Sequence, residues 1–89
     1  MKIDHTQALH FLTDGIAAHL SSVLDGATVL KACAGMIWVH YQGSQIGTVN
    51  VVPDLNGVTL RIMSAGTDPE KLACWIEAAG LDVTMAEAV

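Results

Sequence analysis

Three apolar runs occupy residues 36–63 and form the centre of the hydrophobic pattern. They are rich in Val, Ile, Trp, Tyr and Thr, which fit the pleated surface of a β-sheet, and turn-forming residues separate them. Gly43 can supply the positive φ of a type II′ turn, and Asn56-Gly57 is a strong hairpin signal. The pattern therefore predicts three antiparallel strands joined by tight turns.

The register between these strands decides which side chains face the core, because a slip of one residue turns every side chain to the other face. If Gly43-Ser44 forms a two-residue loop, Trp38 lies opposite Val49 and His40 lies opposite Gly47. This register predicts that Trp38 points into the core.

The second turn has two candidate lengths, a two-residue loop at Asn56-Gly57 or a four-residue loop that starts at Asp54. Both lengths give the same assignment of faces. The expected core face carries Met36, Trp38, Val49, Val51, Val58, Leu60 and Ile62. The opposite face is half polar and carries Ile37, Val39, Tyr41, Ile46, Thr48, Asn50, Thr59 and Arg61.

A first helix is expected from His5 to about Leu24. Asp4 and Gln7 match a capping box at its start, and Gly26 stands where a left-handed C-terminal residue belongs. Its apolar residues recur at helical spacing and form one stripe: Leu9, Leu12, Ile16, Leu20 and Val23. Gly15, in the middle of this helix, indicates either a kink or a close backbone contact.

A second helix is expected after Thr67-Asp68-Pro69-Glu70, which combines a capping box with a proline in the first turn and two carboxylates near the positive end of the helix dipole. Leu72, Trp75, Ile76 and Ala79 form its apolar stripe. Gly80-Leu81 is typical of a Schellman end. Residues 81–85 are expected to add a short edge strand.

Residues 27–33 predict a further strand that turns at Ala34-Gly35. A two-residue loop there places Lys31 beside Trp38 on the core face, which is acceptable only in an edge strand whose ammonium reaches water. Together these elements predict one α+β domain over residues 1–89. Its antiparallel β-meander of three to four strands has two helices packed on one face, in the order α-β-β-β-β-α with the short C-terminal strand at the end.

Composition adds an expectation about surfaces. Only 15% of the residues are charged and 52% are hydrophobic, whereas about 25% charged is typical of globular domains. We therefore expect some of the apolar excess at an interface. No apolar run approaches the roughly 18 residues that span a bilayer, and the N-terminus lacks a secretory apolar region. These features predict a complete, cytoplasmic protein with no membrane contact.

The sequence offers no constellation for catalysis or for a cofactor. His10 lies about 140° from His5 and about 180° from His19 around the first helix, so the three do not form a metal site. No Ser or Cys stands in a nucleophile motif, and no Gly-rich loop opens a helix. We expect no catalytic residue, no metal and no cofactor.

Cys33 and Cys74 match no zinc or redox spacing. Two reduced, mostly buried thiols are expected for a cytoplasmic chain, with a disulfide between them as the alternative.

Charge argues against direct contact with nucleic acid. The order of helices and strands resembles that of double-stranded-RNA-binding domains, which need a basic helix end and a basic loop. This chain has 4 Lys and Arg against 9 Asp and Glu, and a net charge of −5. A protein partner is therefore expected in place of a nucleic acid.

Two functions from different classes remain. The first is a protein-binding inhibitor or adaptor, acting on a larger complex that handles nucleic acid. Small acidic α+β chains without a motif resemble products of phage and mobile elements, anti-CRISPR proteins among them, and this resemblance lies in size and charge alone. The second is a homodimeric structural or chaperone-like protein, which resembles secretion-effector chaperones in architecture. A small-molecule pocket between the sheet and the first helix is a third alternative.

The predicted binding surface is the half-polar face of the sheet, with Tyr41 and Arg61 as the residue types that tend to dominate binding energy. Its binding residues are Ile37, Val39, Tyr41, Ile46, Thr48, Asn50 and Arg61. In the alternative interpretation, a helix or the C-terminal segment simply covers this face.

Overall fold

The computed structural model describes residues 5–55, 57–63 and 66–85. The chain forms α1 (His5–Val23), β1 (Ala27–Cys33), β2 (Met36–Tyr41), β3 (Ser44–Asp54), β4 (Gly57–Met63), α2 (Pro69–Ala78) and β5 (Val83–Met85). The strands form one five-stranded sheet in the order β1-β2-β3-β4-β5. Neighbours β1 to β4 are antiparallel, and β5 is parallel to β4.

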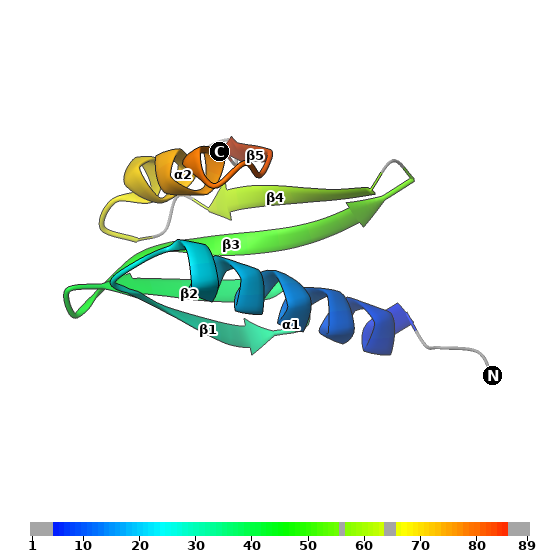
Figure 1. The fold of residues 1–89 in the computed structure, drawn as a ribbon. Coiled ribbons are helices and arrows are strands. Elements are labelled where there is room, and N and C mark those ends of the chain that lie inside the picture. The colour runs from blue at the N-terminus through cyan, green and yellow to red at the C-terminus, as the bar shows by residue number, and fades with distance from the viewer. Residues whose placement is uncertain (1–4, 56, 64–65, 86–89) are drawn as a thin grey trace.

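Both helices lie on the same face of the sheet (Figure 1), which confirms the predicted α+β layout. The buried core lies between the helices and this face. It consists of Leu20 and Leu24 at the end of α1, the sheet residues Ile37, Val39, Ile46, Val49, Val51, Leu60 and Ile62, and Leu72, Ala73 and Ile76 of α2. In the described part of the chain, no helix is long and apolar enough to cross a membrane.

The β2–β3 register differs by one residue from the prediction. Tyr41 pairs with Ser44, so the loop is Gln42-Gly43, and both loop residues have positive φ, 52° and 81°. Two positive φ angles indicate a type I′ turn rather than the expected type II′ turn. This loop by itself would pair Trp38 with Gly47 and keep the predicted faces of β2. In the structure Trp38 pairs with Thr48, so the predicted pairing of Trp38 with Val49 is wrong.

A bulge in β3 supplies the one-residue slip that exchanges the faces of β2. His40 pairs with Gln45 while Val39 pairs with Gly47, so the buried Ile46 is the extra residue on β3. In consequence Ile37 and Val39 are fully buried beneath the helices. The predicted faces of β2 are therefore exchanged, and Met36 and Trp38 lie on the face that the helices do not cover.

The β3–β4 register agrees with the prediction. Val49 pairs with Ile62 and Val51 pairs with Leu60, and all four side chains are in the core. The pairing of Pro53 with Val58 is the one that a four-residue loop from Asp54 gives, although the strands extend by one more pair, Asp54 with Gly57.

The strand β1 forms one edge of the sheet, as its lysine suggested. Leu30 pairs with Trp38 and Lys31 pairs with Ile37, so the expected neighbourhood of Lys31 and Trp38 is wrong. Lys31 lies on the helix-covered face, where its Nζ is 2.8 Å from Oδ1 of Asp14 in α1. The ammonium remains partly exposed there, because it lies at the open rim of the core.

The ends of α2 follow the predicted signals with one difference. Asp68, rather than Thr67, is the N-cap, and its carboxylate accepts a 3.2 Å hydrogen bond from the Lys71 amide. At the other end the Leu81 amide donates to the Ile76 carbonyl at 3.3 Å, which is the long bond of a Schellman motif. The capping residue Asp4, predicted for α1, lies outside the described residues.

The N-terminus of α2 is attached to the β3 bulge. The amides of Thr67 and Asp68 donate to the carbonyls of Gln45 and Ile46, at 3.0 Å and 3.1 Å. Next to the bulge, a Cβ on Gly47 would lie 2.6 Å from Cδ2 of Leu72. The helix therefore packs directly on the backbone of β3, in a position that only glycine allows without a shift.

Candidate functional site

The sheet has a second face that no described segment covers (Figure 1). We call it the open face and define it by the pairing register. Its residues are Thr28, Leu30, Cys33, Met36, Trp38, His40, Gln45, Thr48, Asn50, Val52, Thr59, Arg61, Met63 and Thr84. Because side chains alternate along a strand, these residues all point away from the helices.

A row of side chains that is apolar except for Thr48 crosses the open face. Leu30 pairs with Trp38, Trp38 pairs with Thr48, and Thr48 pairs with Met63, which gives a tryptophan row over β1 to β4. Leu30 and Trp38 are 47% and 41% exposed, and they lie directly opposite each other. Two large apolar side chains are thus held in solvent side by side by the rigid ladder of the sheet.

A polar row lies beside the tryptophan row, two residues further along each strand. Met36 pairs with Asn50, Asn50 with Arg61 and Arg61 with Thr84, which gives an arginine row. The Arg61 side chain is exposed, and its guanidinium forms no ion pair or hydrogen bond with any other described residue. The two described lysines differ from it, because Lys31 pairs with Asp14 and Lys71 lies over the Tyr41 and Trp75 rings.

The predicted binding residues divide between the two faces. Ile37, Val39 and Ile46 are buried in the core, so they are unavailable to a partner, and their expected exposure is corrected. Thr48, Asn50 and Arg61 lie on the open face. Thr48 is buried there among its neighbours, 6% exposed, and its hydroxyl accepts a 3.0 Å hydrogen bond from Gln45, so its expected exposure is corrected too. The role of Asn50 and Arg61 in binding stays a prediction.

Tyr41 belongs to the helix-covered face. Its ring is partly buried and lies 5.0 Å from the Trp75 ring at an interplanar angle of 77°, and the Lys71 ammonium is 4.9 Å from its centre. This edge-to-face pair with a cation over it is typical of a packing contact between α2 and the sheet.

The sequence interpretation missed the exposed pair of Leu30 and Trp38. A signal was present in β2 itself, where the β-branched Ile37 and Val39 alternate with Trp38 and His40. Of the two alternating sets, the one with Ile37 and Val39 at the centre of the strand is the better core face, since the other set has the polar rings of Trp38 and His40 at the corresponding positions. The assumption of regular pairing, without a bulge in β3, gave the opposite assignment.

The described side chains that could bind a metal or act in catalysis do not lie together. In the described part of the chain, no three His, Cys, Asp or Glu residues cluster as metal ligands would. His40 Nδ1 is shielded from water and has no hydrogen-bond partner among the described residues. Cys33 and Cys74 are free and exposed, so their predicted burial is wrong: Cys33 follows an irregularity in β1, and Cys74 lies outside the buried stripe of α2.

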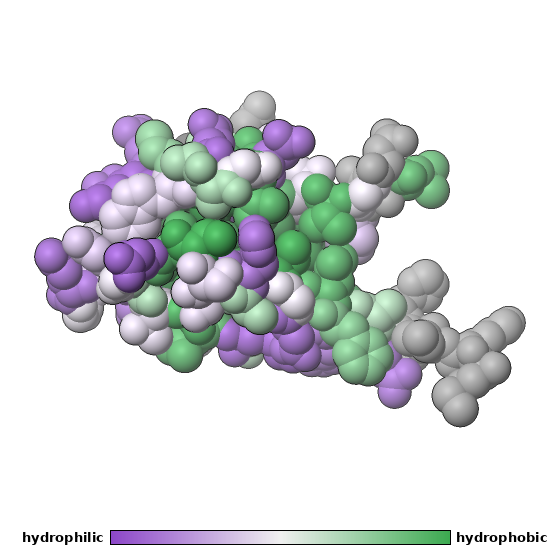
Figure 2. All heavy atoms as spheres, in the orientation of Figure 1, coloured by the Kyte–Doolittle hydropathy of each residue, from purple (hydrophilic) through white to green (hydrophobic). Residues whose placement is uncertain are grey.

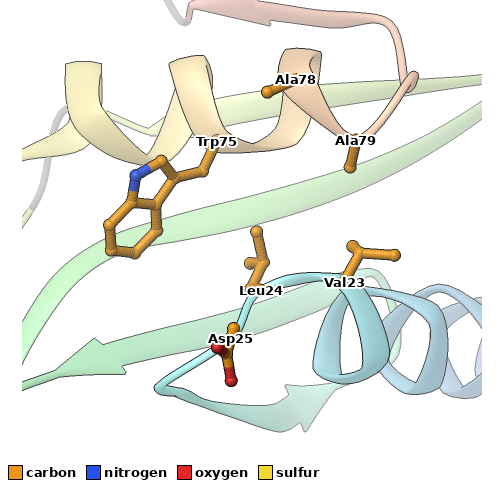
Figure 3. A pocket seen from close by; sticks show the side chains of 6 residues that line it. All are labelled: Val23, Leu24, Asp25, Trp75, Ala78 and Ala79. Carbon is orange, nitrogen blue, oxygen red and sulfur yellow. The ribbon is translucent and has the colours of Figure 1, made fainter.

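A cleft of about 370 Å³ lies between the C-terminal ends of the two helices (Figure 3). It is lined by Val23, Leu24, Asp25, Trp75, Ala78 and Ala79. On this side of the molecule, hydrophobic residues gather between α1 and α2 (Figure 2). The cleft is at the small end of ligand sites, roughly 300–1,000 Å³, and Asp25 is its only charged lining group. It lacks the converging polar groups that would define a ligand.

Comparison with known proteins leaves the interpretation to this chain's own residues. No protein-family model, no curated protein and no solved structure matches the chain.

Proposed function

We propose that this protein is a non-enzymatic protein-binding module, an inhibitor or adaptor, which docks on a larger partner through its open face. The observation that carries the proposal is the pair of Leu30 and Trp38, directly opposite each other and each more than two-fifths exposed. In a domain whose helices cover one face of the sheet, such a pair on the other face does not contribute to the buried core. Exposed apolar patches of this kind usually mark interaction sites.

The residue types on the open face support binding to a protein. Trp and Arg are the side chains most enriched at positions that dominate binding energy. Trp38 and Arg61 lie in adjacent rows and two strands apart, which corresponds to about 10 Å across the strands and about 7 Å along them. An aromatic anchor and an unpaired cation at this spacing fit a partner surface that offers an apolar pocket and a carboxylate.

The acidic side chains that the structure describes lie away from the open face. The carboxylates whose side chains the structure describes all lie on helices or connecting loops: Asp14, Asp25, Asp68, Glu70, Glu77 and Asp82. A partner can therefore contact the open face without meeting these negative charges, while the acidic helix side repels nucleic acid. This arrangement agrees with an inhibitor or adaptor of the phage or mobile-element kind that the chain resembles in size and charge.

The test is affinity capture from the source cells with matched bait proteins. Wild type, Trp38→Ser, Arg61→Ala and Phe11→Ser are compared, because Phe11 is a 68% exposed aromatic residue on α1, away from the open face. We expect a partner that is captured by wild type and Phe11→Ser and not by Trp38→Ser or Arg61→Ala. Each of the last two changes should weaken the free energy of binding by roughly 1–3 kcal/mol. Far-ultraviolet circular dichroism and thermal melts establish that all four baits are folded.

A partner retained equally by all four baits would contradict the open-face proposal. Loss with Phe11→Ser alone would instead move the binding surface to α1.

A further inference from the structure

The sheet has two edges of unequal length. The edge strand β1 has 7 residues, whereas β5 at the other edge has 3. Alternate residues of an edge strand point their backbone N–H and C=O groups away from the sheet, and short strands limit this exposure. Among the described strands β1 pairs with β2 alone. The Ala27 amide donates to the Leu24 carbonyl at 3.2 Å, and beyond Ala27 no described strand pairs with the outward-pointing donors and acceptors of β1.

The devices that normally protect an edge are displaced or missing in β1. Its sequence contains no proline, and Lys31 is its only charged residue. The Lys31 ammonium is held over α1, 2.8 Å from Oδ1 of Asp14 and 3.1 Å from Nδ1 of His10. The irregularity in β1 lies beyond Lys31, which leaves five regular pairs from Ala27 to Lys31.

From this geometry we propose that β1 is a self-association strand, which pairs antiparallel with β1 of a second copy to form one continuous sheet. A two-fold axis at Val29, the centre of the regular stretch, places the strand against itself. Thr28 then lies opposite the partner's Leu30, and Ala27 lies opposite the partner's Lys31.

A second copy fits this edge by charge and by shape. No like charges oppose each other in this register, since each Lys31 faces an alanine and is already paired with its own Asp14. The half-exposed Leu30 gains a neighbour in the partner's Thr28. The two-fold axis is perpendicular to the sheet, so both open faces end on the same side, and the tryptophan rows of the two copies become neighbours.

The proposal is tested by charge reversal in matched pairs. Thr28 and Leu30 are exposed, so charged side chains there leave the isolated subunit folded. The Thr28→Lys/Leu30→Lys variant places two pairs of lysines opposite each other across the axis, and Thr28→Glu/Leu30→Glu does the same with carboxylates. Each variant should raise the dimer dissociation constant at least about tenfold in sedimentation velocity. An equimolar mixture should restore a heterodimer, since every lysine then faces a glutamate.

Two further measurements separate this inference from the proposed function. Arg61→Ala lies on the open face away from β1, so it should lose the captured partner and still dimerise as wild type does. Amide hydrogen exchange should show protection of residues 27–31 that increases with protein concentration.

A wild type that stays monomeric at millimolar concentration would overturn the inference, whether or not an extended segment of another protein binds β1. A mixture of the two variants that stays monomeric would overturn it too, and so would a dimer that Arg61→Ala dissociates.

Discussion

The backbone amide of Gly35 donates a 2.8 Å hydrogen bond to Oγ1 of Thr13, 22 residues earlier in the chain. The same hydroxyl donates to the Leu9 carbonyl at 2.6 Å, so both its donor and its acceptor functions are satisfied in a fully buried position. Gly35 has φ of 84°, and a Cβ there would lie 3.3 Å from Leu9. This contact joins α1 to the β1–β2 turn and thereby helps to determine which face of the sheet is covered.

Replacing Thr13 with valine tests this contact. Thr13→Val keeps the shape of the side chain and leaves the buried Gly35 amide without an acceptor, which should lower the free energy of unfolding by about 1–3 kcal/mol. Urea denaturation measures the change. The exposed Thr84 provides the control, because Thr84→Val removes a hydroxyl from the surface and should alter stability by less than about 0.5 kcal/mol. Equal effects at the two positions would show that the hydrogen bond contributes nothing specific.

Two adjacent residues of β2 test the register. Ile37→Ala opens a cavity beneath the helices and should lower the free energy of unfolding by about 2–5 kcal/mol. Trp38→Ala removes a larger side chain from the open face and should cost less, about 1 kcal/mol or below. Guanidinium chloride denaturation of the two variants gives the comparison. The reverse order of costs would restore the register in which Trp38 faces the core.

Gly47 and Gly15 are expected to respond to alanine with opposite signs. At Gly47 the added methyl group meets Cδ2 of Leu72 at 2.6 Å, so Gly47→Ala should destabilise the fold by about 1–3 kcal/mol. At the exposed Gly15 nothing lies within 4 Å of the new Cβ, so Gly15→Ala should stabilise α1 by about 0.5–1 kcal/mol. Thermal melts of both variants measure the two changes in stability. A stabilising Gly47→Ala would show that α2 does not pack this closely on β3.

The two thiols should react in the folded protein. Cys33 and Cys74 are both free and exposed, so Ellman's reagent should titrate two thiols per chain without denaturant. Cys74→Ser serves as the control and should leave one. If fewer than two thiols reacted in the native wild type and both reacted after denaturation, one of them would be covered in the folded protein. If Cys33 became unreactive only at high protein concentration, contacts between copies near β1 would be indicated.

Much of the fold follows from local signals. The limits of α1, the start of α2 at Pro69 and its Schellman end agree with prediction, because periodicity, a capping carboxylate and a left-handed glycine act within a few residues. The β3–β4 register was also predictable, since both candidate loops gave one assignment of faces. These features depend on residues that are neighbours in the sequence.

The candidate site was decided by tertiary structure instead. Gln42-Gly43 and Gly43-Ser44 are both acceptable two-residue loops, but exchanging one for the other shifts the pairing by two residues and keeps the faces of β2. The extra residue Ile46 in the β3 bulge supplies the one-residue slip that exchanges these faces. In the structure the α2 N-terminus binds the β3 bulge at Gln45 and Ile46, and Leu72 occupies the space above Gly47. These contacts join residues more than 20 positions apart. Sequence alone therefore determined where the strands and helices lie, whereas only the packing of α2 against β3 decided that Trp38 faces outward and Ile37 faces inward.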